Sequence, residues 1–239
     1  MKKLFSSLFL IVFAGLTVFA QQTVNDPNAE KRTIAGFHGI DVATGIELTL
    51  TKGNTEEVAV SAAATGFRDK IMTRVENGIL KIYYETKTGS INKKNETKGL
   101  KAWVSYKSLD KLYATTGAEV KIDGVLEASS LDMKANTGAK IDGKVDIGTL
   151  SLDQNTGSKV TLSGKAGKLE AEGSTGSKFT GEDLSTTTCN VQVSTGARII
   201  VNAEKELQVK ASTGGTVKYK GGAGIREIKT NTGGTVSKI

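Results

Sequence analysis

Apolar and polar positions alternate along the second half of this 239-residue chain in a pattern that repeats with a Thr-Gly dipeptide. Its seven copies are Thr116-Gly117, Thr137-Gly138, Thr156-Gly157, Thr175-Gly176, Thr195-Gly196, Thr213-Gly214 and Thr232-Gly233, in steps of 21, 19, 19, 20, 18 and 19 residues. The fourth residue before each Thr and the fourth after it are apolar in every copy, and the second after it is small. Even spacing of apolar positions predicts strands and not helices.

Each repeat also carries the residues of a chain reversal. Asn, Ser or Thr precedes the Thr-Gly pair, and such residues favour turns because their side chains bond nearby backbone. The Gly after Thr provides a left-handed backbone at little steric cost. A period near nineteen residues predicts an all-β fold, a parallel β-helix in which like residues stack at a spacing of about 4.8 Å. The Thr hydroxyls themselves could form an inward hydrogen-bonded ladder.

Cys189 stands where four other repeats carry leucine, six residues before the Thr. Those leucines are Leu131, Leu150, Leu169 and Leu207. We therefore expect Cys189 to be a buried apolar filler, and not a reactive thiol.

The first twenty residues predict a signal peptide. Lys2 and Lys3 precede a mostly apolar stretch from Leu4 to Phe19, and Ala20 offers a small residue for cleavage. Cleavage would expose Gln21 and not cysteine, so we expect no lipid anchor. The sequence predicts an exported protein in the periplasm, at the cell surface or outside the cell, with no transmembrane segment.

The middle of the chain keeps the strand pattern while losing the repeat. Residues 21–32 are polar and are expected to be a disordered linker. Residues 33–108 contain alternating segments, including a hairpin around Asn77-Gly78, and predict irregular β-strand coils that cap the array. Residues 109–239 then form the repetitive parallel β-helix, with about seven rungs of 18–21 residues.

The order of these features resembles the putative auto-transporter adhesin, head GIN domain family of exported proteins from Bacteroidetes-type bacteria. The resemblance covers residues 33–239, beginning with the segment Phe37–Val42 and continuing through Ile46–Leu50 and Val75–Leu80 to the Thr-Gly repeats. It implies a right-handed parallel β-helix and a role at the cell envelope. It supplies no binding residues.

Composition excludes several kinds of chemistry. One histidine, His38, and one cysteine leave no set for a Ser-His-Asp or Cys-His site, a disulfide or a zinc site of several His and Cys residues. We expect His38 in a surface or turn role, no bound metal and no cofactor. Asp123 and Asp142, each in Lys-Ile-Asp-Gly, are the nearest approach to the paired acids of carbohydrate-active β-helix enzymes. Their offsets from the preceding Thr differ, seven against five, which disfavours that alternative.

The third residue after the Thr is basic in four successive repeats, whereas the other three repeats carry Glu119, Thr216 and Thr235. These four cations form the basic column, namely Lys140, Lys159, Lys178 and Arg198. Its neighbours at two and four face inward, so these cations point outward at rung spacing, where they can pair with the repeated anions of a polysaccharide or lipopolysaccharide. The alternative is that they only keep a flat β-face soluble. The net charge of +7 is spread along the chain and does not indicate nucleic-acid binding.

These features together predict a non-enzymatic, adhesin-like envelope protein that binds anionic glycan or lipopolysaccharide. The alternative is a structural protein whose role is assembly without a specific ligand. The end rungs of a parallel β-helix leave strand edges open, so a homo-oligomer formed through an exposed end is a second partner interaction that the fold allows.

Overall fold

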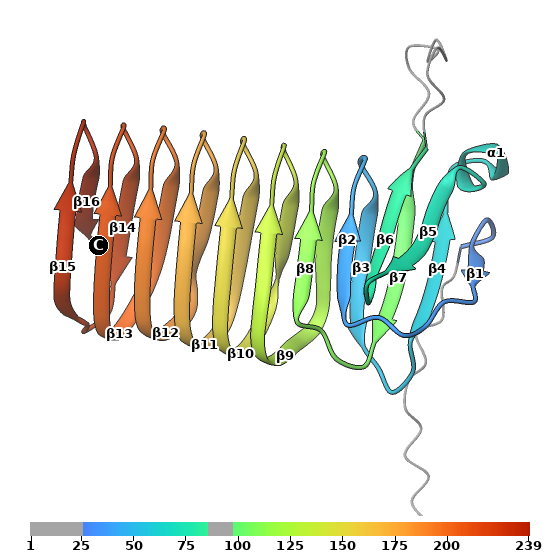
Figure 1. The fold of residues 1–239 in the computed structure, drawn as a ribbon, viewed down its shortest axis with the longest axis horizontal. Coiled ribbons are helices and arrows are strands. Elements are labelled where there is room, and N and C mark those ends of the chain that lie inside the picture. Colours follow the sequence, from blue (N-terminus) through green and yellow to red (C-terminus); the bar gives the residue numbers. More distant parts are fainter. Residues whose placement is uncertain (1–25, 86–97) are drawn as a thin grey trace, which may run out of the picture.

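The computed structural model describes residues 26–85 and 98–239. It is almost entirely β-structure, a stack of parallel rungs with a cap of antiparallel strands at its N-terminal end (Figure 1). The rung strands are β2 (Gly39–Val42), β3 (Glu47–Lys52), β8 (Lys111–Ala114), β9 (Glu119–Ala135), β10 (Lys140–Gln154), β11 (Lys159–Gly173), β12 (Lys178–Val193), β13 (Arg198–Ala211), β14 (Thr216–Lys220), β15 (Gly224–Thr230) and β16 (Thr235–Lys238). The predicted parallel β-helix is confirmed.

Each of the seven repeated Thr-Gly pairs forms the sharp corner of a rung, at the top of Figure 1. The Thr residues have φ of 45–60° and the following Gly residues 70–76°, so both adopt the left-handed conformation. In the Thr156-Gly157 corner the Ser158 amide donates to the Asn155 carbonyl at 3.2 Å, which closes a type I′ turn. β-Branched residues rarely adopt this conformation, so each corner stores backbone strain.

The corners are hydrogen-bonded to one another along the stack. The Gly157 amide donates to the carbonyl of Thr175 in the next rung at 3.0 Å, and the other corners repeat this bond. The Thr side chains of the seven repeated corners are exposed. In five of them the hydroxyl bonds the side chain of the preceding residue, as Thr156 does with Asn155 Oδ1 at 3.3 Å. The inward Thr ladder is therefore wrong. The inward positions are taken by the apolar columns, which pack into one continuous core.

The repeat begins earlier than the sequence pattern indicated. Thr44-Gly45 forms an eighth corner, with β2 and β3 on its two sides, and the Gly45 amide donates to the Thr116 carbonyl at 3.0 Å. This rung lies directly against β8 and β9, although about 60 residues separate the two in sequence. The intervening chain folds back over the outer side of the β2–β3 rung, and so it hides the repeat from a search for a fixed interval.

The N-terminal cap turns the parallel stack into antiparallel pairing. Its elements are β1 (Glu30–Arg32), β4 (Glu57–Ser61), α1 (Thr65–Arg68), β5 (Ile71–Glu76), β6 (Ile79–Tyr84) and β7 (Lys101–Tyr106). Strands β6 and β7 run parallel to β2 and β3, whereas β5 is antiparallel to β6, β4 to β7 and β1 to β4. The hairpin expected at Asn77-Gly78 joins β5 to β6. Strand β1 lies inside residues 21–32, which were expected to be a disordered linker. Its antiparallel pairing with β4 gives Glu30–Arg32 a defined structure. The signal peptide and most of the polar loop that follows β6 lie outside the described residues.

Differences in rung length are absorbed away from the corners. Strands β9 to β13 each run down one face, around the rounded lower edge of Figure 1 and up the other face. Their register shifts fall near the rounded edge, for example between Asp142 and Lys144 where β10 pairs with β9. Such bulges add residues without moving the corner, so the outward columns keep their alignment on both faces.

Replacing a corner Thr should stabilise the protein. Asn tolerates the left-handed conformation and is a preferred first residue of a type I′ turn. We expect Thr156→Asn to raise the free energy of unfolding by about 1 kcal/mol, as measured by chemical denaturation. Thr161→Asn is the matched control, because Thr161 is an exposed strand residue of β11 without positive φ. A loss of stability in Thr156→Asn would contradict the assignment of strain to the corner.

Cys189 should resist thiol reagents in the folded protein. It is 1% exposed, as expected of a filler, and burial raises the pKa of its thiol to about 12. A neutral thiol is a poor nucleophile, so at pH 8 labelling should be roughly a thousandfold slower than in denaturant, where the thiol has its ordinary pKa. The absorbance of a released aromatic thiolate measures both rates. Rapid labelling of the native protein would show that the core opens at this position.

Candidate functional site

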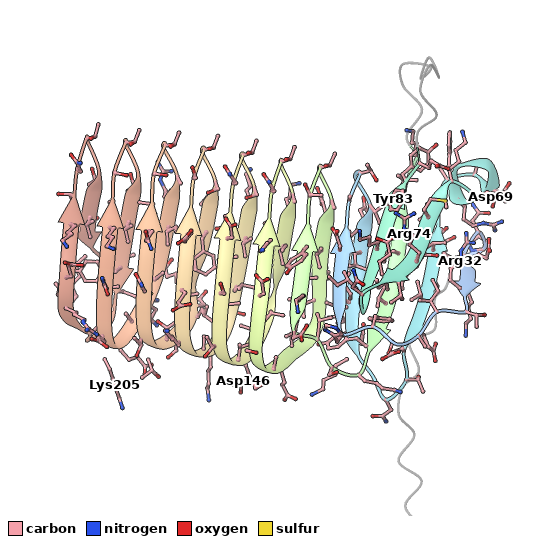
Figure 2. All side chains as sticks on the ribbon, viewed as in Figure 1. Arg32, Asp69, Arg74, Tyr83, Asp146 and Lys205 are labelled. Carbon is pink, nitrogen blue, oxygen red and sulfur yellow. The ribbon has the colours of Figure 1, made fainter. Side chains whose placement is uncertain are left out.

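The solenoid offers two flat faces, a sharp Thr-Gly edge and a rounded edge on which outward side chains are arranged. Figure 2 shows Asp146 and Lys205 projecting from the rounded edge. Strand registers hold equivalent residues of successive rungs side by side, so any outward position becomes a column parallel to the stack. A surface site on this fold is therefore built from columns, and its charge pattern is set by one residue per rung.

The basic column forms as predicted in its geometry. Lys140 lies opposite Lys159, Lys159 opposite Lys178, and Lys178 opposite Arg198, and all four are exposed. Like charges on adjacent strands destabilise a sheet, so the column carries a small cost to stability.

Only part of the basic column is available to a ligand. Lys140 Nζ lies 2.5 Å from Glu119 Oε1 in the preceding rung, and this hydrogen bond raises the pKa of Lys140. Among the described residues, no carboxylate forms an ion pair with Lys159, Lys178 or Arg198. Those three cations are the part of the column that can pair with external anions.

The two aspartates considered as a catalytic pair do not face each other. Asp142 lies opposite Lys121, whereas Asp123 lies opposite Thr51 on the other side of β9. Both side chains are exposed, and their different offsets from the corner place them at different heights along the strands. The structure thus provides no convergent acids at these positions.

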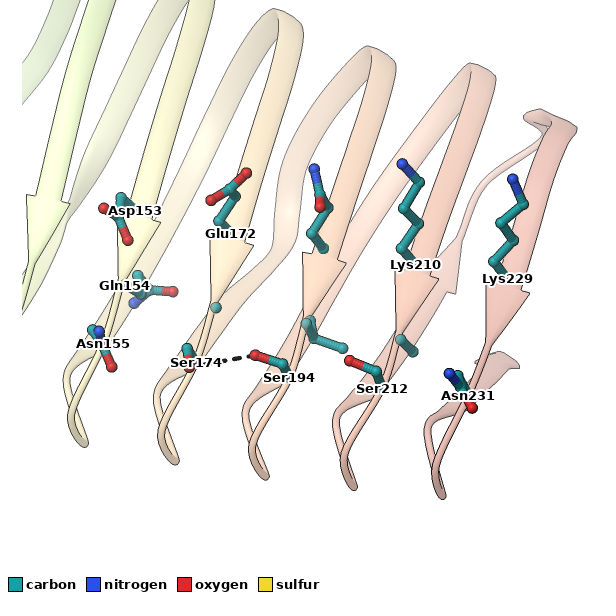
Figure 3. Close-up of a pocket in the computed structure, with 14 residues that line it drawn as sticks. Asp153, Gln154, Asn155, Glu172, Ser174, Ser194, Lys210, Ser212, Lys229 and Asn231 are labelled. Atoms are coloured by element: carbon teal, nitrogen blue, oxygen red, sulfur yellow. Dashed lines mark hydrogen bonds between the residues drawn. The ribbon is translucent and has the colours of Figure 1, made fainter.

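A groove of about 430 Å³ runs along the other face of the sharp edge. Figure 3 shows it crossing five rungs, with two columns of side chains along it. The column nearer the corner is made of small polar residues, namely Asn155, Ser174, Ser194, Ser212 and Asn231, and the outer column comprises Asp153, Glu172, Gln192, Lys210 and Lys229. We call this feature the axial groove. Its volume is in the range of small-molecule sites.

The axial groove combines hydroxyl, carboxamide and charged groups, with few internal contacts. Ser194 Oγ donates to Ser174 Oγ at 3.3 Å, and Lys229 Nζ lies 2.5 Å from Glu227 Oε1. Beneath the acidic end, Gln154 is 1% exposed, and its Nε2 donates to the Lys178 carbonyl at 3.2 Å. Its Oε1 has no hydrogen-bond donor among the described residues.

Sequence reasoning missed the axial groove. Its outer column stands three residues before each Thr, in the same repeat that revealed the basic column three residues after it. The charges could have been read from that position. The hollow between the two columns could not be predicted from the sequence, because it depends on how the strand turns into the corner.

A cluster of paired polar groups lies at the N-terminal rungs. His38 Nδ1 is 2.7 Å from Asp110 Oδ1, and this hydrogen bond lowers the pKa of Asp110. The Tyr113 hydroxyl donates to Asp132 Oδ2 at 2.5 Å, and burial, with this hydrogen bond, raises the pKa of Tyr113. The half-exposed His38 occupies the surface role expected from sequence. These groups satisfy one another and leave no free base beside a nucleophile.

Metal and membrane features are absent from the parts of the chain that the structure describes. No three His, Cys, Asp or Glu side chains within residues 26–85 and 98–239 are grouped so that they could hold a metal ion. In the same ranges, no helix has the length and apolar character needed to cross a membrane.

Known structures share this architecture at low sequence identity. A putative adhesin from Bacteroides fragilis superposes with a TM-score of 0.76 at 17% identity, over 88% of this chain and 96% of that one. A putative adhesin from Parabacteroides merdae gives 0.69 at 14% identity, over 88% and 95%. A putative lipid binding protein from Parabacteroides distasonis gives 0.68 at 15% identity, over 90% and 98%. At these identities the likeness establishes the fold.

The sequence comparison identifies the family. Among curated proteins, none matches the chain. The family model described as putative auto-transporter adhesin, head GIN domain, matches residues 36–223, which covers the rungs from β2 to β14 and most of the cap. A match over most of the chain shows that the protein belongs to the putative auto-transporter adhesin, head GIN domain family.

Proposed function

We propose that the protein is an exported, adhesin-like envelope protein that binds anionic glycan, including lipopolysaccharide, and does not act as an enzyme. Export agrees with the signal peptide expected at residues 1–20 and with the adhesin family. The observation that carries the ligand assignment is the run of three exposed cations, Lys159, Lys178 and Arg198, which form no internal ion pair with the described carboxylates.

The physical basis is a match of spacing and charge. Successive rungs hold the three cations at roughly 4.8 Å intervals, on strands whose register cannot slide because the opposite sides are buried. A polymer with an anion on each sugar meets several cations without the protein having to rearrange. Charge-assisted hydrogen bonds to carboxylate or phosphate are stronger than neutral ones, so a few such contacts are sufficient for measurable binding.

Neutralising the three unpaired cations should abolish most of this binding. We expect residues 21–239 to bind lipopolysaccharide and polygalacturonate, a lipid-free anionic glycan, but not dextran. The variant Lys159→Ser/Lys178→Ser/Arg198→Ser should bind both at least about tenfold more weakly, a loss of about 1.4 kcal/mol. Binding should also weaken with salt, which screens exposed charges. Biolayer interferometry with immobilised ligand measures these affinities.

A matched control separates the column from net charge. Lys144→Ser/Lys165→Ser/Lys205→Ser removes three exposed cations that lie outside the basic column. It should bind like the wild type. If both variants lost affinity equally, the binding would depend on net charge and not on the basic column. If the variant without the column cations bound as tightly as the wild type, the assignment of the site would be overturned.

Self-association is a second candidate function, and the exposed apolar residues of the last rung support it. Ile225 and Ile228 lie opposite the buried Leu207 and Val209, yet they are 52% and 38% exposed. They face inward, and no described residue covers their outer side. We propose that a second copy packs its own last rung on this one, so that the exposed isoleucines of the two copies bury each other in a closed twofold pair.

Sedimentation velocity over a concentration series tests this association. The wild-type protein should shift from monomer to dimer, whereas Ile225→Ser/Ile228→Ser should remain a monomer. Ile200→Ser is the control, because Ile200 is a partly exposed apolar residue on the flat face of β13. A wild-type protein that stays monomeric at every concentration would exclude the dimer.

A further inference from the structure

The axial groove separates opposite charges along its length. Its outer column begins with two carboxylates, Asp153 and Glu172, continues through Gln192, and ends with two ammonium groups, Lys210 and Lys229 (Figure 3). The strand registers place each of these directly opposite the next. Four steps of about 4.8 Å put the acidic and basic ends roughly 19 Å apart.

This charge order is not the one that stability alone would favour. Asp153 lies opposite Glu172, although its other neighbour in the preceding rung is Lys134. Lys210 lies opposite Lys229, so each end of the groove contains one step with like charges on adjacent strands. Like charges in cross-strand positions are destabilising, whereas opposite charges stabilise. The same four side chains in alternating order would form favourable pairs.

A polar group beneath the groove is not fully satisfied within the protein. Gln154 faces inward, on the opposite side of its strand from Asp153, and its buried Oε1 has no donor among the described residues. Figure 3 shows this oxygen on the side of the rung of Ser174. A buried acceptor without a partner costs free energy. It lies beside the column of Asn and Ser side chains, whose hydroxyl and carboxamide groups both donate and accept hydrogen bonds.

We infer that the axial groove binds a zwitterionic glycan chain. Amino groups of its sugars contact Asp153 and Glu172, and carboxylate groups several sugars along contact Lys210 and Lys229. Sugar hydroxyls bond the Ser and Asn side chains nearer the corner. The chain lies parallel to the stack, so each sugar meets one or two rungs.

The groove suits a glycan better than a peptide. Backbone groups along it are already bonded between rungs, as in the bonds from the Ser194 amide to Gly173 and from the Ser212 amide to Val193. An added peptide strand would therefore find no free ladder to extend. The lining also offers no deep apolar pocket for side chains, since its apolar members are only Val193 and Ala211.

The inference rests on the proposed function only in taking the ligand to be a glycan. The basic column and the axial groove lie on the two strands that flank the corner, and they share no residue. The two sites can therefore be tested separately, by examining the groove in a protein that already lacks the basic-column cations Lys159, Lys178 and Arg198.

Exchanging the charges within the groove provides the test. In the background Lys159→Ser/Lys178→Ser/Arg198→Ser, the further changes Glu172→Lys and Lys210→Glu keep composition and net charge but make the signs alternate. We expect the melting temperature to rise by about 2 °C or more. The affinity for carboxymethyl-chitosan oligosaccharides, which carry both amino and carboxylate groups, should fall at least tenfold. A purely structural role for these charges would not lower affinity while raising stability.

The probes distinguish the remaining readings. The background protein should bind carboxymethyl-chitosan more tightly than chitosan, which is only cationic, and than carboxymethyl-cellulose, which is only anionic. If the background protein and the charge-exchanged variant bound carboxymethyl-chitosan equally well, the inference would be overturned. It would also be overturned if the background protein did not bind carboxymethyl-chitosan at all. A peptide with lysines at one end and glutamates at the other that binds as tightly would replace the glycan with a protein ligand. If the exchange does not fold, Glu172→Gln/Lys210→Gln provides the same affinity comparison.

Discussion

The hydrogen bond from each corner glycine to the threonine carbonyl of the next corner is the interaction on which this structure depends. It joins the sharp edges of all eight rungs into one line of backbone bonds. Because it forms only when two consecutive residues are left-handed, the corner requires glycine second, and here it also forces a β-branched threonine into an unfavourable conformation at every step. The strand registers and the buried apolar columns make this cost tolerable, since each rung buries its inner face only against its neighbours.

A fixed corner has consequences for the surface. Insertions are absorbed at the rounded edge, and so the positions just before and just after the corner align in every rung. Substitution at one such position therefore changes one step of a ladder and leaves the fold intact. The basic column and the axial groove occupy the two sides of the same edge, and both accept like-charge neighbours that a purely structural surface would avoid. Both proposed binding sites therefore lie at the Thr-Gly edge, and not at the rounded one.

Much of this could be predicted from sequence, because a repeat exposes its own columns. The period, the apolar positions, the buried place of Cys189 and the alignment of the cations all follow from residue spacing. The rung at Thr44 could not be predicted from spacing, because the cap elements from β4 to β7 separate Thr44 from Thr116 and the fixed interval is lost. Thr65-Gly66 lies in α1, so the dipeptide alone does not define a corner. The different offsets of Asp123 and Asp142 from the corner were legible in the sequence and already disfavoured their pairing. The hollow of the axial groove was not, because it depends on curvature that no single repeat encodes.

Amide hydrogen exchange at the corner glycines tests the central claim most directly. These residues are exposed at the surface, so an isolated turn would exchange its amide within seconds. If each glycine amide is bonded to the next corner, then Gly138, Gly157 and Gly176 will exchange as slowly as the neighbouring strand amides, with protection falling toward Gly214 at the open end. Fast exchange at the corners beside protected strands would show that the corners do not hold the rungs in register.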